Sequence, residues 1–258
     1  MKSSITLRKL ISMEFYKVVI LEINDINVFG DCAFGIMEMP QNKKVLNNVN
    51  KKQFKKIYEY IGNRSYGKTM YGLFLFEMVL VEYYNKYHDQ FNKAELQLYK
   101  IFFDNEFMKL SPAGKASNVC PFDVVVVNKA YCKQKKVRPI DIIYHEISHF
   151  VYFFDSKLEK MTKQVFKKID KRYRDNVIGY LTIAKAYKKE QIHYEWLANL
   201  VDNDMGMKEI YRFSKPSANT KKLIKELKKF TEDYIDLVLN FKEYSDATKE
   251  CNNSEISG

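Results

Sequence analysis

Residues 137–155 read Val-Arg-Pro-Ile-Asp-Ile-Ile-Tyr-His-Glu-Ile-Ser-His-Phe-Val-Tyr-Phe-Phe-Asp and contain the motif His145-Glu146-Ile147-Ser148-His149. On a helix, residues four apart lie on the same face, so His145 and His149 can bind one metal ion together. Glu146 follows the first histidine, where it can hold a water on that metal rather than the metal itself. The segment therefore predicts a metal-binding helix around which the rest of the fold is arranged.

The residues around the motif favour a buried helix. Pro139 suits a first helical position, Asp141 suits the positive N-terminal end, and neither Gly nor Pro follows until well past the motif. Apolar residues occupy nearly every side of this helix, as is typical of a helix that passes through a core: Ile142, Ile143, Ile147, Phe150, Val151, Phe153 and Phe154.

A later segment offers a third ligand, which a catalytic zinc site needs beside one open position for water. Glu195 lies 46 residues after His149, and Asn199 and Asp202 follow it at helical positions i+4 and i+7. The three side chains therefore share one helix face. We expect Glu195 to bind the metal and Asn199 or Asp202 to accept a hydrogen bond from a ligand imidazole.

An HExxH helix followed by a helix with Glu-x-x-Ala-Asn resembles the gluzincin group of zinc metallopeptidases. The long gap between the motifs looks most like the anthrax lethal-factor-like and Pro–Pro endopeptidase branch, and the resemblance covers residues 138–203. It implies an α+β, mainly helical, zincin-like domain with an active-site helix and a small sheet, Zn²⁺ as cofactor and a peptide or protein substrate.

The same branch uses a tyrosine seven residues before the ligand glutamate to stabilise the oxyanion. This chain departs from that pattern, since Lys188 stands at that offset and Tyr187 precedes it. Tyr187 and Tyr194 are therefore both candidates for the role.

The predicted function is that of a zinc-dependent endopeptidase. His145, His149 and Glu195 would bind zinc, and Glu146 would accept a proton from the attacking water as general base. The strand expected at Val124–Val127 could be the edge strand along which an extended peptide lies. A non-catalytic zinc-binding interaction module is an alternative with the same ligands.

A rival third ligand is Asp155, six residues after His149, where metzincin-type enzymes place their last ligand. Those enzymes need a Gly at the position of Tyr152, because the chain must turn out of the helix there. Tyr152 lies instead within an unbroken apolar helix pattern, which favours Glu195.

A second motif, Gly62–Thr69, matches the P-loop pattern GxxxxGK[ST] and predicts, as an alternative function, a nucleotide-binding protein. A P-loop needs a buried strand before it. Residues 51–61 show helical spacing instead, with apolar side chains at Phe54, Ile57, Tyr58 and Ile61. This spacing favours a corner between two helices.

The chain has 258 residues, of which 46% are hydrophobic, a net charge of +11 and a sequence pI near 9.2. This charge permits attraction to nucleic acid, anionic lipid or acidic protein. Lysines alternate with apolar residues at helical spacing along the whole chain, which favours solvated helix faces over a nucleic-acid surface. The composition leaves the oligomeric state open.

The pattern along the chain divides it into an N-terminal α+β region of unknown role (1–115), a zincin-like catalytic region (116–244) and a flexible tail (245–258). Strands are expected at 15–23, near 32–39 and at 122–127, with turns at 24–30 and a loop at 111–121. A buried helix is expected at 70–84, and further helices at 157–170, 173–189, 191–203 and 218–243.

No signal peptide or membrane span is expected, because charged residues interrupt each apolar run. The four cysteines form no CxxC pair, which favours free thiols in a reducing compartment and leaves a Cys120–Cys132 bridge open. These features suit a cytoplasmic enzyme, or a toxin or effector that a leaderless route delivers into another cell.

Overall fold

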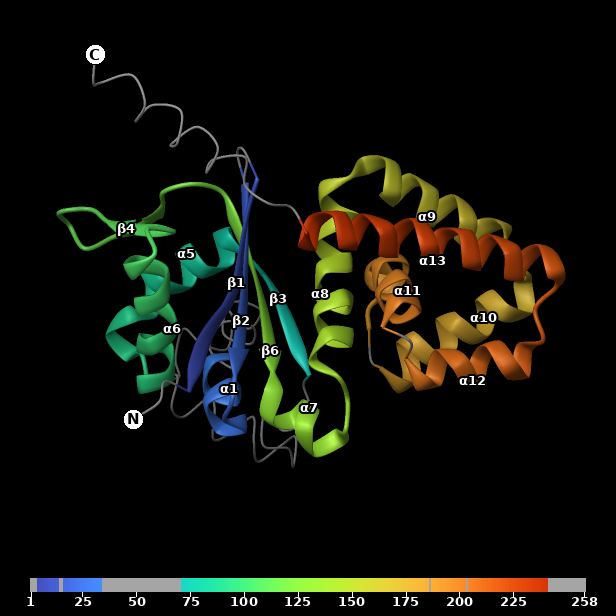
Figure 1. Ribbon diagram of the computed structural model, residues 1–258, viewed down its shortest axis with the longest axis horizontal. Helices are drawn as coiled ribbons and strands as arrows, with labels where there is room; N and C mark the ends of the chain where they lie inside the picture. The colour runs from blue at the N-terminus through green and yellow to red at the C-terminus, as the bar shows by residue number, and fades with distance from the viewer. Residues whose placement is uncertain (1–3, 14–15, 34–70, 186, 203, 241–258) are drawn as a thin grey trace, which may run out of the picture.

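A computed structural model of the chain describes residues 4–13, 16–33, 71–185, 187–202 and 204–240. It is mainly helical with a small sheet, an α+β arrangement as the sequence predicts. Figure 1 shows the sheet between two groups of helices, with the long helix α8 directly against one sheet face. The P-loop-like segment Gly62–Thr69, the loop at 40–50 and the tail at 245–258 lie outside the described residues, as does nearly all of the strand expected near 32–39.

The main sheet has four strands in the order β1-β2-β6-β3. β1 (Ile5–Met13) pairs antiparallel with β2 (Tyr16–Ile23), and β2 pairs parallel with β6 (Phe122–Asn128). β3 (Gly72–Phe76) pairs antiparallel with the other side of β6. The strands predicted at 15–23 and 122–127 are confirmed, and every residue of β6 is buried, as its run of valines requires.

Each sheet face covers a separate apolar core. Val19 and Val124 point into a core shared with α1 (Ile26–Ala33), α5 (Glu77–Tyr87) and α6 (Lys93–Asp104). A small hairpin of β4 (Met108–Leu110) and β5 (Ala116–Asn118) lies on the same side. Val18 and Val125 point into the other core, which α8 and the helices after it complete.

The C-terminal helices form a layer beyond α8, with α13 beside α9 (Figure 1). They are α7 (Lys129–Lys135), α8 (Pro139–Phe154), α9 (Ser156–Lys168), α10 (Lys171–Gly179), α11 (Ile192–Val201), α12 (Met205–Ser214) and α13 (Ala218–Leu239). A π-helical turn at Tyr180–Ala184 continues α10. The predicted helices at 137–155, 157–170, 191–203 and 218–243 are confirmed to within a few residues. None of the described helices has the length and apolar character that crossing a membrane requires.

Several local predictions are wrong. Residues 70–84 are not one helix, because β3 occupies 72–76 before α5 begins at Glu77. The stretch 24–30 is not a turn, because Asp25 Oδ1 accepts hydrogen bonds from the N–H groups of Asn27 and Val28 and so begins α1. The loop at 111–121 contains β5, the helix at 173–189 ends at Ala184, and α12 and β1 were not predicted.

The edge-strand prediction for Val124–Val127 is also wrong, because β6 lies between β2 and β3. Among the described strands, β3 forms the sheet edge beside α8. β6 also pairs with strands that precede residue 115, so the N-terminal and C-terminal regions share one sheet. The division of the chain near residue 115 stays a prediction.

A buried carboxyl group at the start of β6 makes the fold sensitive to pH. Asp123 is only 3% exposed. Burial raises its pKa to about 6, although hydrogen bonds from the Tyr16 side chain and the Glu77 N–H act in the opposite direction. The native state therefore holds this proton more tightly than the unfolded chain does, so stability falls as pH rises from about 4 to about 6.

We expect Asp123→Asn to raise the free energy of unfolding at pH 7 by up to about 3 kcal/mol, because the amide never ionises. The gain should shrink toward zero at pH 4, where the wild-type carboxyl is protonated. Urea unfolding at both pH values measures this difference. A gain at pH 4 as large as that at pH 7 would contradict the assignment.

Candidate metal centre

α8 carries the first two candidate ligands. The helix begins at Pro139, has Asp141 in its first turn, and buries most of its middle, as the sequence predicts. His145 and His149 lie on one face, with their ring centroids 5.0 Å apart. The four-residue spacing therefore directs both imidazole rings to the same side of α8.

α11 brings the third ligand to that side. Glu195 is 6% exposed and follows the helix start by one turn. Its Oε2 lies 3.7 Å from Nε2 of His145, and its Oε1 lies 3.8 Å from Nε2 of His149. The ligand atoms of the three residues all lie within 4.8 Å of one another. This buried cluster could hold a metal ion.

The cluster fits a small cation in geometry and in chemistry. Ligands about 2.1 Å from a tetrahedral zinc are about 3.4 Å apart, only slightly closer than the distances found here. Oε2 of Glu195 is buried and has no hydrogen-bond partner in the described part of the chain. A buried carboxylate oxygen without a partner is costly, and a cation between it and the imidazoles would remove that cost.

A second acidic side chain on α11 supports His145. Oδ2 of Asp202 lies 2.7 Å from Nδ1 of His145, and Asp202 Oδ1 accepts a hydrogen bond from the N–H of Asp204. This bond places the proton of the imidazole on Nδ1 and leaves Nε2 for the metal. Asp202 therefore occupies the supporting position that the sequence predicts.

Asn199 has a different place from the one expected. Its Nδ2 donates a hydrogen bond to the main-chain carbonyl of Glu195 at 2.6 Å. The expected hydrogen bond from a ligand imidazole to its side chain is not formed. Nδ1 of His149 is buried and has no partner among the described residues. Asn199 thus holds the backbone of α11 at the ligand, and of the two candidates only Asp202 orients an imidazole.

The charges around the cluster favour a cation. Burial lowers the pKa of His145, but the bond to Asp202 and the charges of Glu146, Asp202 and Glu195 outweigh it and raise the pKa to about 9. Without a metal, His145 is therefore protonated at neutral pH, and a metal ion at Nε2 would displace that proton. Burial and the charge of His145 hold the pKa of His149 well below its ordinary value, so His149 is neutral, as a metal ligand must be. Three carboxylates thus surround two imidazoles in a buried site.

Glu146 faces the sheet edge. The residue is 7% exposed, and burial raises the pKa of its carboxyl to about 7. The positive charge of His145 lowers this pKa, and the negative charge of Glu195 raises it further. A Cβ on Gly72 of β3 would lie 2.9 Å from Oε1 of Glu146 and 2.6 Å from Cγ2 of Ile142. Because Gly72 has no side chain, the Glu146 carboxylate can pack directly against β3.

The two candidate tyrosines differ in what they reach. The side chain of Tyr187 hydrogen-bonds Glu195, and burial, followed by the charge of Glu195, raises its pKa far above the ordinary value. The ring of Tyr194 packs edge-on against His149, with centroids 5.3 Å apart, and its side chain bonds Gln191. Both lie at the cluster, and Tyr187 contacts a ligand through its hydroxyl.

The rival ligand is not part of the cluster. Asp155 ends α8 and begins α9, where its Oδ1 accepts a hydrogen bond from the N–H of Lys157 at 2.7 Å. His193, on the same helix as Glu195, packs instead against Phe166 with ring centroids 5.1 Å apart. The described residues therefore bring Glu195, and neither of these, to the two histidines.

β3 supplies the neighbours that the sequence did not reveal. Gly72 lies beside Glu146, Phe74 lies beside His149 with centroids 6.3 Å apart, and the ring of Phe76 contacts that of Phe153 at 5.6 Å. Alternate residues of the edge strand thus follow α8 along the site. The one sequence feature that could have indicated these neighbours is Gly72 at the start of an apolar run, because a glycine in a strand often marks the close approach of another group.

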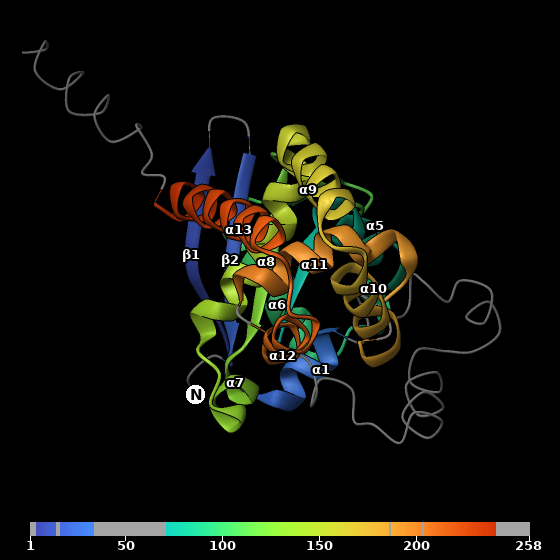
Figure 2. The same ribbon diagram turned by 90° about the vertical axis from the view of Figure 1, so that its right-hand side faces the viewer.

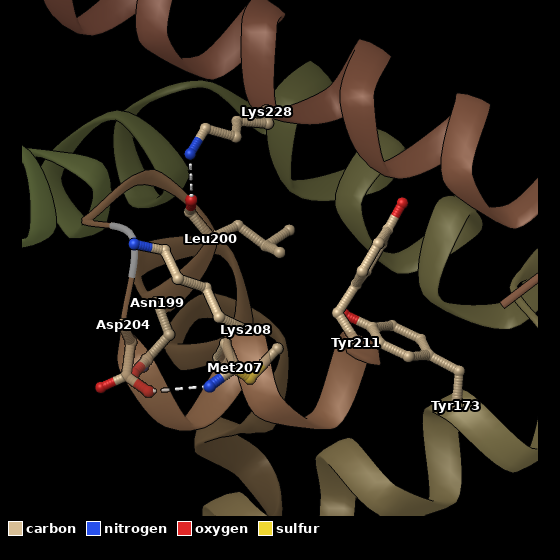
Figure 3. Close-up of a pocket in the computed structure, with 8 residues that line it drawn as sticks. All are labelled: Tyr173, Asn199, Leu200, Asp204, Met207, Lys208, Tyr211 and Lys228. Carbon is tan, nitrogen blue, oxygen red and sulfur yellow. Dashed lines mark hydrogen bonds between the residues drawn. The ribbon is translucent and has the colours of Figure 1, made fainter. Parts of the chain in front are cut away.

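A cavity lies between α10, α11, α12 and α13. It measures about 220 Å³, and Figure 3 shows its lining side chains, among them Asn199, Tyr173 and Tyr211. None of the three metal ligands lines it.

The chain matches no protein-family model, no curated protein and no solved structure. The geometry of the site is therefore the ground on which a function is proposed.

We expect Gly72→Ala to lower the free energy of unfolding by about 1–3 kcal/mol, because the new methyl group overlaps Ile142 and Glu146. Ile142→Ala removes the nearest contact, so the double variant should lose less stability than the sum of the losses in Gly72→Ala and Ile142→Ala alone. Urea unfolding of both single variants and the double variant measures the coupling.

Gly179→Ala is the matched control, because nothing lies within 4 Å of a Cβ at that helical position. It should leave stability unchanged or raise it slightly. A Gly72→Ala variant as stable as this control would refute the close approach.

Proposed function

We propose that the protein is a zinc-dependent endopeptidase. The observation that carries the proposal is the position of Glu146. Its carboxylate lies beside the buried cluster of His145, His149 and Glu195 but is not one of the three candidate ligands. Two His and one Glu form a ligand set used by catalytic zinc, which leaves a position open for water. The resemblance of the two helices to the gluzincin pattern supports the same choice.

Zinc in this cluster would lower the pKa of a water and polarise the scissile carbonyl. His145 and His149 would hold the ion through Nε2, and the hydrogen bond to Asp202 would keep His145 in the tautomer that this requires. Glu195 would supply the negative charge, with Tyr187 hydrogen-bonded to its carboxylate.

Glu146 moves the proton. It accepts a proton from the attacking water and then gives it to the leaving amine, so that the carboxylate is restored at the end of the cycle. Its position beside Gly72 keeps the carboxylate between the sheet edge and the cluster. Tyr187 or Tyr194 would donate a hydrogen bond to the oxygen that becomes negative in the transition state. Tyr187 would first have to release Glu195, because its hydroxyl has one proton and donates it to that carboxylate.

An extended peptide would bind along β3. Among the described strands, β3 forms the sheet edge beside the cluster, and an edge strand presents unpaired backbone groups to which a peptide can add. Gly72, Phe74 and Phe76 lie on its face toward α8, so a peptide in this register would pass the cluster.

We expect Glu146→Gln to keep its zinc and to lose peptidase activity by roughly 10²–10⁴-fold, because the amide cannot accept the proton. A denatured proteome incubated with the protein serves as substrate, and mass spectrometry counts new peptide termini. Glu190→Gln, an exposed glutamate near α11, is the control that should retain activity.

Two results would contradict the proposal. Activity that survives in Glu146→Gln would exclude this general base. Zinc bound by the wild-type chain without any new peptide termini would indicate the non-catalytic zinc-binding module instead.

A further inference from the structure

Two short segments carry a marked excess of positive charge. Residues 167–175 and 212–222 hold nine Lys or Arg side chains and two Asp, a net charge of +7. The first segment joins α9 to α10, and the second joins α12 to α13.

Hydrogen bonds bring these segments together. The N–H of Ser217 donates to Oδ2 of Asp170 at 2.6 Å, and the N–H of Asp170 donates to Oγ1 of Thr220 at 2.9 Å. Nδ2 of Asn176 donates to Oγ of Ser214 at 2.8 Å. Four helix ends therefore meet at one end of the molecule, on the side that faces the viewer in Figure 2. We call residues 167–175 and 212–222 the basic end.

Most cations of the basic end are not neutralised by neighbours. Five are exposed and form no ion pair within the described part of the chain: Lys167, Lys168, Arg172, Lys215 and Lys221. Others pair with acidic residues, as Lys171 does with Asp175 and Arg212 with Glu209. Like charges held this close repel one another, so an anionic partner would stabilise the group.

An exposed aromatic ring lies in the same surface. Phe213 lies in the last turn of α12 with 64% of its surface exposed, and the guanidinium of Arg212 lies 5.0 Å from the centre of its ring. An apolar ring beside a guanidinium, in a segment that also carries exposed lysines, suits a membrane interface, where the ring enters the acyl boundary and the cations reach the headgroups.

We propose that the basic end binds the surface of an anionic membrane, with the lysines on lipid headgroups and Phe213 inserted between them. A lipid surface suits these residues better than nucleic acid does, because six of the nine cations are lysines and the exposed ring has no role on a phosphate backbone. The proposal is independent of the peptidase proposal, since the metal cluster uses no residue of the basic end.

Flotation of the full chain with vesicles tests it, using phosphatidylcholine alone and phosphatidylcholine mixed with phosphatidylserine. We expect binding to the anionic vesicles only, weakened by salt. Each removed lysine should weaken binding about fivefold, because a cation near such a surface contributes about 1 kcal/mol. Lys167→Gln/Lys168→Gln/Lys221→Gln should therefore reduce binding by about two orders of magnitude, and Phe213→Ser should reduce it at unchanged charge.

The matched control is Lys93→Gln/Lys109→Gln/Lys115→Gln, which removes three exposed lysines from α6 and the β4–β5 hairpin. It should retain most of the binding. Equal losses in both triple variants would overturn the proposal, because net charge alone would then govern binding. No binding to anionic vesicles, or tighter binding to a mixed-sequence oligonucleotide than to vesicles, would overturn it too.

Discussion

The packing of α11 against α8 is the contact on which the candidate metal centre depends. α8 supplies both histidines, so their spacing is fixed within one helix. Glu195 reaches them only if α11 packs against α8 at the correct distance and in the correct register. Trp196, Leu197 and Leu200 are buried in the core that also contains Ile143 and Ile147 of α8. Apolar burial thus supports an arrangement of polar groups that would be unfavourable by itself.

That unfavourable arrangement is itself informative. Glu146, Glu195 and Asp202 place three carboxylates around two buried imidazoles, and one Glu195 oxygen lacks a partner within the described residues. A group of this kind gains from a bound cation, so metal binding and folding are expected to be coupled. The sheet contributes from the other side, where Gly72 lets β3 approach Glu146 and Phe74 and Phe76 continue along α8.

Local signals predict the site better than they predict the sheet around it. His145, Glu146 and His149 follow from a four-residue spacing between a proline start and an apolar helix, and Glu195 and Asp202 follow from the same periodicity. β3 could not be recognised, because Leu73 and Leu75 face one core while Phe74 faces the other, so the run shows no alternation. The central place of β6 depends on pairing with strands far away in the chain, which no short pattern encodes. The role of Gly72 depends on that pairing in turn.

Zinc content and affinity of the purified chain test the central claim most directly. The wild type should bind one zinc per chain by mass spectrometry, and Asp155→Ala should bind it equally well. Glu195→Ala should lose it, and Asp202→Asn should weaken it about 10–100-fold, because His145 would lose the partner that orients it. A chain that binds no zinc after reconstitution, or one that loses zinc with Asp155→Ala and keeps it with Glu195→Ala, would contradict the site described above.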